Sequence, residues 1–292
     1  MVDAVFDPHA LLARKFSPVR HDYSERDCML FSLGCGLGQD PLDAGQLRYV
    51  YEGEKGGLAV FPVMVNVLGY SGFWADQPDT GIAWRKLVHA EQAIVLHRPL
   101  SAQGSVIGRN RVLALHDKGI EKGALMLQER EIVDAASGEM LAQVMQTTLL
   151  RGNGGSGAKL GPIPRAPHPM PHRVADAVCD LSTLPQAALL YRLNGDLNPL
   201  HADPVVAAAA GFPRPILHGL ATMGVAAHAV LKTMLGYDER LLRAMRVRFT
   251  APVFPGDTLR TEMWRDGDVV SLRTIALERS VQVLGAGRID LA

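Results

Sequence analysis

The sequence predicts an α+β protein in which each half of the chain combines a helix with a curved antiparallel sheet. Three observations support this fold class. Residues 151–175 are rich in Gly and Pro, which disfavour helices and central strands, so they predict a linker between residues 1–150 and 176–292. In each half a helix-like segment precedes several strand-like segments. Residues 219–235 are apolar on nearly all helical faces, as in a buried central helix.

The individual elements follow from local signals. In the first half, Ser24 and Asp27 have the spacing of a capping box and predict a helix over 24–33. Strand-like segments follow the helical segment in each half. The expected strands are 93–97, 104–111, 124–134 and 141–150 in the first half, and 246–250, 258–265, 269–276 and 281–290 in the second.

Composition excludes several classes of protein. The 292 residues contain 30 Lys and Arg against 30 Asp and Glu, so no overall charge favours nucleic acid or an anionic membrane. The three cysteines include an odd member and have no CxxC spacing, which indicates reduced thiols. No apolar run approaches the roughly 20 residues of a membrane span, and the first residues lack a signal peptide's pattern. We therefore expect a cytoplasmic protein with no membrane partner.

The run Tyr191-Arg-Leu-Asn-Gly-Asp-Leu-Asn-Pro-Leu-His201 places a carboxylate, an amide and an imidazole within six positions. Asn198 is a good N-cap, and Pro199 suits the first turn of the helix that we expect to continue to Ala210. His201 falls in that turn, and Asp196 lies in the loop just before the cap. Such an acid–base pair is suited to proton transfer to or from a bound substrate.

This run resembles the signature of the hydratase-2 family, the (R)-specific enoyl-CoA hydratases, which belong to the MaoC-like dehydratases with hot-dog folds. The match continues through two further blocks, 211–219 and 248–259. Asn194 stands where the family usually has Ser or Thr. The resemblance is strongest over residues 180–292 and extends more weakly to 23–27 and 87–92. It implies two hot-dog domains in one chain, each a curved sheet wrapped around a helix.

The resemblance also implies an activity, the reversible hydration of trans-2-enoyl-CoA to (3R)-3-hydroxyacyl-CoA. Asp196 and His201 would divide the two proton transfers, while Asn198 either orients the water or serves only as a cap. The helix expected from Gly219 has unpaired N–H groups at its start, and the family places an oxyanion donor at the position that matches Gly219. Coenzyme A is part of the substrate, and no cofactor is expected. The resemblance also implies a homodimer.

The first half contains no such catalytic motif, and the family uses this half to accommodate the acyl tail. Arg214, Arg246 and Arg248 are candidates for binding the phosphates of coenzyme A. Glu91 is a candidate accessory acid between the halves, although a structural carboxylate is the alternative interpretation.

Other interpretations compete with these. Asp196, His201 and His218 form a conceivable metal triad, but the chain has no HExxH motif, so we expect no metal. His218 is interpreted as a packing or hydrogen-bonding residue, and His228 as a core histidine. Alternative functions are dehydration of a 3-hydroxyacyl group on acyl carrier protein, action on a branched, steroid-derived or dicarboxylic acyl-CoA, thioester hydrolysis, and binding of acyl-CoA without catalysis.

Overall fold

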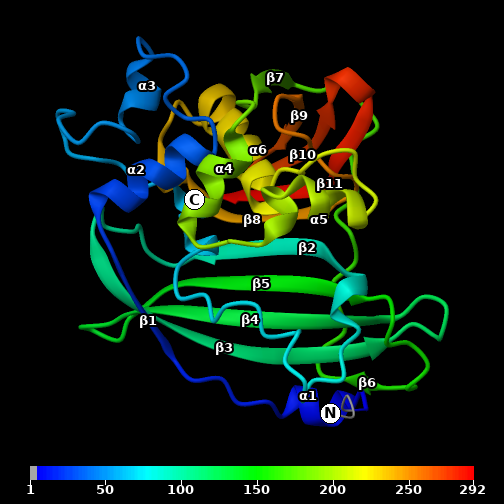
Figure 1. Cartoon of the computed structure of the whole chain (residues 1–292). Helices are drawn as coiled ribbons and strands as arrows, with labels where there is room; N and C mark the ends of the chain where they lie inside the picture. Colours follow the sequence, from blue (N-terminus) through cyan, green and yellow to red (C-terminus); the bar gives the residue numbers. More distant parts are fainter. Residues whose placement is uncertain (1–4) are drawn as a thin grey trace.

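The computed structural model of the chain describes residues 5–292. An 11-stranded antiparallel sheet runs through both halves, in the order β1-β3-β4-β5-β2-β8-β11-β10-β9-β7, with β6 paired to β3 off this path (Figure 1). The strands are β1 (Val19–Tyr23), β2 (Leu87–Leu96), β3 (Gly104–Asp117), β4 (Ala124–Asp134), β5 (Met140–Leu150), β6 (Lys159–Leu160), β7 (Ala177–Ser182), β8 (Leu242–Phe249), β9 (Thr258–Asp266), β10 (Val269–Ala276) and β11 (Val281–Leu291).

The helices are mostly short. The α-helices are α1 (Pro8–Leu12), α2 (Glu25–Gly34), α3 (Ala44–Leu47), α4 (Ala187–Tyr191), α5 (Pro204–Ala209) and α6 (Gly219–Met234). The 3-10 helices are η1 (Pro62–Asn66), η2 (Trp84–Lys86), η3 (Arg192–Asn194), η4 (Pro199–His201), η5 (Glu239–Leu241) and η6 (Leu277–Arg279).

The two halves of the sheet repeat one topology. The first half runs β1-β3-β4-β5-β2 and the second β7-β9-β10-β11-β8, so that the second strand of each half lies at the junction. There β2 and β8 pair antiparallel from Glu91↔Arg248 to Val95↔Ala244. The eight predicted strands are present, although β2 begins at Leu87 and β8 at Leu242, earlier than expected. The short edge strands β1 and β7 had no clear signal in the sequence.

Helix α6 occupies the centre of the second half. Its residues from Ala221 to Leu231 are all buried, and it packs against β7 and β9. This agrees with the long apolar helix expected from the sequence. Exposing a helix that is apolar all round to water is unfavourable. The sheet of the second half therefore curves around α6 and covers it.

The first half has no long central helix, which differs from the sequence expectation. Helix α2 begins at its capping box, as predicted, but it has only 10 residues and packs against α4 of the second half. Between α2 and β2, the described residues contain only α3, η1 and η2. This segment is rich in glycine, which disfavours a longer helix.

The linker predicted over 151–175 follows the surface of the sheet. Strand β6 lies within it and pairs with β3. Further along, the indole Nε1 of Trp264 donates a hydrogen bond to the carbonyl of Arg173 (2.8 Å), and His168 Nε2 lies 2.7 Å from Ser271 Oγ. The linker is therefore fixed to both halves.

The larger of two hydrophobic core clusters joins the two halves. Phe31 of α2 lies 5.7 Å from Tyr191 at the end of α4, and 6.1 Å from Phe61, measured between ring centroids. All three side chains are fully buried. Because Tyr191 begins the segment with the acid–base motif, this packing holds that segment against the first half.

Gly224 allows α6 to approach the first half closely. A Cβ atom at this position would lie 2.3 Å from the Sγ atom of Cys35. We expect Gly224→Ala to lower the free energy of unfolding by about 1–3 kcal/mol because of this overlap, although alanine normally stabilises a helix interior. Urea unfolding measures the change. Adding Cys35→Ala should recover part of the loss, and purely additive effects would contradict this explanation.

Candidate active site

The loop after α4 positions the acid–base motif. Gly195 has a φ of 107° and ends η3, a conformation that glycine adopts at low cost. Asn198 caps η4, accepting a hydrogen bond at its side-chain oxygen from the Leu200 N–H (3.0 Å). The predicted cap is therefore present.

The continuous helix expected from Pro199 to Ala210 is wrong. Helix η4 ends at His201, and α5 begins separately at Pro204 with Asp203 as its N-cap. Asp203 has φ −100° and ψ 116°, an extended conformation that is favoured before proline. Gly211, with φ 86°, lies just past the end of α5, where the sequence predicts the stop.

Asp196, His201 and His218 converge from two segments. One carboxylate oxygen of Asp196 and one ring nitrogen of each histidine all lie within 4.8 Å of one another. Both histidines are buried, and Asp196 is half-buried. The structure thus brings the predicted pair together and adds a second histidine that the motif does not contain.

His201 is held in one orientation. Its Nδ1–H donates a hydrogen bond to the carbonyl of Ile216 (2.8 Å), which leaves a lone pair on Nε2. Its ring stacks on His218 with 3.7 Å between centroids and 26° between planes. Burial lowers the pKa of His201 below its usual value, so the imidazole is neutral at pH 7 and able to accept a proton.

His218 links the loop to α6. It is the N-cap of that helix, and its Nε2–H donates a hydrogen bond to the backbone carbonyl of Asp196 (3.1 Å). Its Nδ1 atom is buried and finds no partner among the described residues. Burial first, and then the charge of His201, lower the pKa of His218. These contacts fit the hydrogen-bonding role that the sequence suggests.

Gly219, the first residue of α6, follows His218 directly. At the first helical position the backbone N–H has no partner inside the helix. A Cβ atom here would lie 3.2 Å from the ring of Phe249, so glycine leaves room between the helix start and β8. The N-terminus of α6 therefore presents a free donor close to the histidine pair.

The first half contributes neighbours that the sequence did not identify. A β-bulge between His89 and Glu91 reverses the usual alternation of side chains, and His89 Nε2–H donates a hydrogen bond to Gln92 Oε1 (2.9 Å). The His89 ring lies 4.7 Å from that of Phe249. Burial lowers the pKa of His89 to about 4, and the charge of Asp196 acts on it in the opposite direction. A bulge has no reliable sequence signal, which explains why the sequence did not identify His89.

The remaining predicted site residues, Glu91 and the three arginines, make contacts outside the cluster of Asp196 and the two histidines. Glu91 pairs with Arg248 across the junction of β2 and β8 (2.6 Å), a contact that fits the alternative of a structural carboxylate. Arg246 donates a hydrogen bond to the carbonyl of Ala166 (2.8 Å). Exposed Arg214 lies over the ring of Phe254, 5.2 Å from its centroid. Binding of coenzyme A by these arginines stays a prediction.

The three clustered side chains have the composition of a metal site. The hydrogen bonds to Ile216 and Asp196 engage one nitrogen of each histidine and leave the other nitrogen free. This arrangement suits a proton-transfer site and also a set of metal ligands. The expected absence of a metal therefore stays a prediction.

Two family models match the chain. A MaoC like domain matches residues 167–286, and the MFE-2 hydratase 2 N-terminal domain matches residues 21–152. The peroxisomal enoyl-CoA hydratase 2 of Arabidopsis thaliana is 38% identical, with 99% of this chain and 96% of that protein covered. The chain belongs to the hydratase-2 family of MaoC-like dehydratases. This confirms the resemblance, and the chain is a hydro-lyase.

Solved structures agree. A MaoC-like dehydratase from Phytophthora capsici has a TM-score of 0.86 at 30% identity, with 97% of this chain and 98% of that one covered. A Mycobacterium tuberculosis protein described as having a double hot-dog fold has a TM-score of 0.55 at 18% identity, with 95% of this chain and 96% of that one covered. The predicted double hot-dog fold is confirmed.

Location and assembly stay predictions. Among residues 5–292, no helix is long and apolar enough to cross a membrane. The Arabidopsis relative is named as peroxisomal, so its name gives no support to the cytoplasmic location expected from the sequence. The homodimer likewise rests on the resemblance.

The buried histidines predict a loss of stability in acid. Burial lowers the pKa of His89 and of His228 from 6.5 to about 4, so between these values the unfolded chain binds more protons than the native state. The free energy of unfolding should therefore fall as the pH falls through this window, by up to about 1.4 kcal/mol per pH unit for each histidine. Urea unfolding at a series of pH values measures the slope. His228→Gln should reduce it, and an unchanged slope would contradict the assignment.

Proposed function

We propose that the protein catalyses the reversible hydration of trans-2-enoyl-CoA to (3R)-3-hydroxyacyl-CoA. The observation that carries the proposal is the convergence of Asp196 and His201 beside the N-terminus of α6. The similarity to an enoyl-CoA hydratase 2 over 99% of the chain supports the same reaction.

The acid–base pair supplies the proton transfers. Water must lose a proton as its oxygen attacks the β-carbon, and the α-carbon must gain one. His201 offers the lone pair on Nε2, and Asp196 offers carboxylate oxygens within 4.8 Å of the histidine cluster. Together they can hold the water, accept its proton and deliver a proton to the α-carbon. In each turnover the enzyme takes one proton from water and gives one to the α-carbon. The proposed reaction therefore needs no cofactor.

The N-terminus of α6 supplies the electrostatic stabilisation. As the β-carbon is attacked, negative charge develops on the thioester oxygen. The Gly219 N–H and the positive end of the α6 dipole favour that charge. A fixed donor of this type lowers the barrier by about 2.7–4 kcal/mol.

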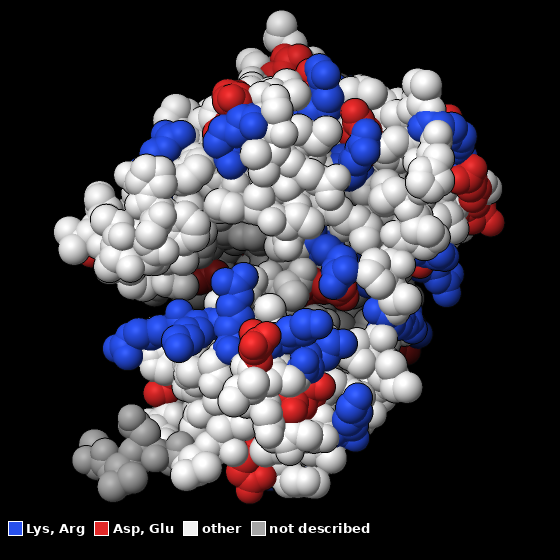
Figure 2. Space-filling view, turned by 90° about the vertical axis from the view of Figure 1, so that its right-hand side faces the viewer, with Lys and Arg blue, Asp and Glu red and all other residues white. Residues whose placement is uncertain are grey.

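The two halves would share the binding of the substrate. On the face in Figure 2, a hollow separates the first half below from the second half above, and Lys and Arg side chains lie along its margins. Cations in this position suit the phosphates of coenzyme A. Because the first half lacks a long central helix, we place the acyl tail on the concave side of its sheet.

The reverse reaction is the second candidate. The 3-hydroxyacyl-thioester dehydratase Y of Mycobacterium tuberculosis is 38% identical, with 89% of this chain and 87% of that protein covered. Dehydration uses the same groups in reverse, so the site is equally suited to it. The preferred direction depends on the concentrations of the enoyl and 3-hydroxyacyl thioesters and on the thioester carrier of the substrate.

Replacing the acid–base pair tests the proposal. Asp196→Asn and His201→Gln should each lower kcat about 10²–10⁴-fold, because each removes one proton-transfer group. Loss of the conjugated-thioester absorbance measures the rate with trans-2-enoyl-CoAs of several lengths, and an (R)-specific dehydrogenase identifies the product. Asp203→Asn is the matched control, since asparagine also caps a helix and Asp203 lies outside the cluster. Release of free coenzyme A would indicate a thioesterase instead.

The oxyanion donor can be removed with little change of shape. Gly219→Pro removes the N–H at a position where a helix tolerates proline, and His218 already has the extended ψ of 136° that precedes proline. We expect kcat to fall about 10²–10³-fold. Gly219→Ala keeps the N–H and adds the contact with Phe249, so it measures the steric effect alone. Equal losses in both variants would exclude the backbone donor.

A further inference from the structure

Arg130 is a buried cation that has no carboxylate partner within residues 5–292. It lies on β4 with 7% of its surface exposed. Its guanidinium donates one hydrogen bond, to the carbonyl of Asn66, and lies over the ring of Tyr70 at 5.5 Å from the centroid. Its Nε atom is buried and finds no acceptor among the described residues.

This arrangement is costly for the protein alone. Arginine stays protonated in proteins, and a buried charge without a counter-charge loses the stabilisation of water. The neighbouring cations are compensated: Arg111 pairs with Glu129 (2.6 Å), and Arg14 pairs with Asp79 (2.9 Å). Lys15 is exposed to solvent. The uncompensated charge therefore belongs to Arg130.

Arg130 lines a cavity on the inner face of the first-half sheet. The cavity has a volume of about 30 Å³ and is also lined by Tyr70, Gln128, Gln146 and Glu129, whose carboxylate is paired with Arg111. Since a water-sized group needs roughly 10–15 Å³ by the same measure, this space accommodates about two such groups, the number of oxygens in a carboxylate.

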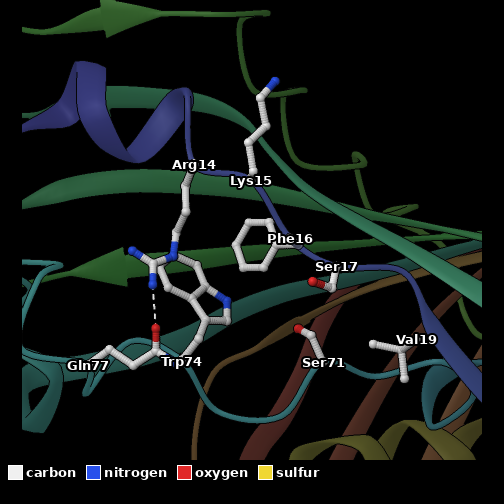
Figure 3. Close-up of a pocket in the computed structure, with 8 residues that line it drawn as sticks. All are labelled: Arg14, Lys15, Phe16, Ser17, Val19, Ser71, Trp74 and Gln77. Atoms are coloured by element: carbon white, nitrogen blue, oxygen red, sulfur yellow. Dashed lines mark hydrogen bonds between the residues drawn. The ribbon is translucent and has the colours of Figure 1, made fainter.

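A larger cavity of about 240 Å³ adjoins it, and Phe16 and Ser71 line both. In Figure 3 Arg14 lies over Trp74 and bonds to Gln77, while the Phe16 ring lies beside them and Lys15 extends away. The two cavities therefore lie next to each other in the first half.

The Arg130 cavity also lies toward the active site. Tyr70 lines it, and the charges of both Asp196 and Arg130 act on the Tyr70 hydroxyl. A second connection runs through buried side chains. Gln92 donates a hydrogen bond to the side-chain oxygen of Asn66 (2.7 Å) and accepts one from His89, and Asn66 in turn accepts one from Arg130.

We propose that Arg130 binds a carboxylate at the far end of the acyl chain, so that the enzyme prefers ω-carboxylated enoyl-CoA substrates. This inference rests on the proposed function and adds the class of acyl tail. The guanidinium has donors beyond the one that it gives to Asn66, and a charge-assisted hydrogen bond from such a donor to a carboxylate is stronger than one between neutral groups. The ligand would supply the counter-charge that the folded chain lacks.

The test compares trans-2-enoyl-CoAs of equal length that end in a methyl, a hydroxyl or a carboxylate group. At the length that reaches Arg130, kcat/KM should be about 10- to 100-fold higher for the carboxylate than for the methyl terminus. Arg130→Met should abolish this preference and keep the rate on the methyl-terminated chain. Lys15→Met is the matched control, because Lys15 lines the adjoining cavity with its charge exposed to solvent.

Three results would overturn the inference. Wild-type enzyme could treat carboxylate and methyl termini alike at every length, the preference could persist in Arg130→Met, or the hydroxyl terminus could gain as much as the carboxylate. Arg130→Gln, with thermal unfolding of both variants, covers the case in which Arg130→Met does not fold.

Binding measurements distinguish a failure of this inference from a failure of the proposed function. Saturated acyl-CoAs with carboxylate or methyl ends cannot be hydrated, and their dissociation constants report Arg130 directly. Hydration of methyl-terminated chains without a carboxylate preference in binding would refute only the inference. A carboxylate preference in binding that depends on Arg130, with no hydration of any chain, would refute only the proposed function.

Discussion

The burial of α6 is the constraint on which the rest of the structure depends. All residues from Ala221 to Leu231 are buried, including Gly224, where the helix approaches Cys35 of the first half. A helix of this composition is stable only when other elements cover it on all sides. The sheet of the second half and the α2 region of the first half together cover it. The start of α6, with its free N–H groups, consequently lies beside the acid–base pair.

The two halves use one topology for different purposes. In the second half a long helix fills the concave side of the sheet. In the first half the corresponding face is covered by the irregular segment around η1, and it carries polar side chains such as Gln92, Gln128 and Arg130. A polar inner face is a poor hydrophobic core but a suitable lining for a ligand site. We therefore propose that, after duplication of the fold, one half carries the chemistry and the other selects the substrate.

Burial also sets the protonation states of the site. His201 and His218 stack face to face. If both rings were protonated, their positive charges would repel each other at this distance. Removal from water and mutual repulsion both favour the neutral rings. The backbone carbonyls of Ile216 and Asp196 then fix which nitrogen carries the proton. These contacts leave a proton-accepting lone pair on Nε2 of His201 and on Nδ1 of His218.

The sequence by itself determined the features that depend on neighbouring residues. The Ser24 capping box, the Asn198 cap, the apolar α6 and the eight strands of the two halves all follow from local patterns, and the motif from Asp196 to His201 indicated the reaction class. Local patterns misjudged the helix after Pro199, because Asp203-Pro204 starts a second cap that overrides continuation.

Only the tertiary structure decided the rest. The stacking of His218 on His201, the β-bulge that turns His89 inward and the uncompensated charge of Arg130 all join residues far apart in the chain. Their effects depend on burial and on which groups lie across a sheet or a cavity. Those relations arise from the packing of the whole chain, so no short segment of the sequence contains them.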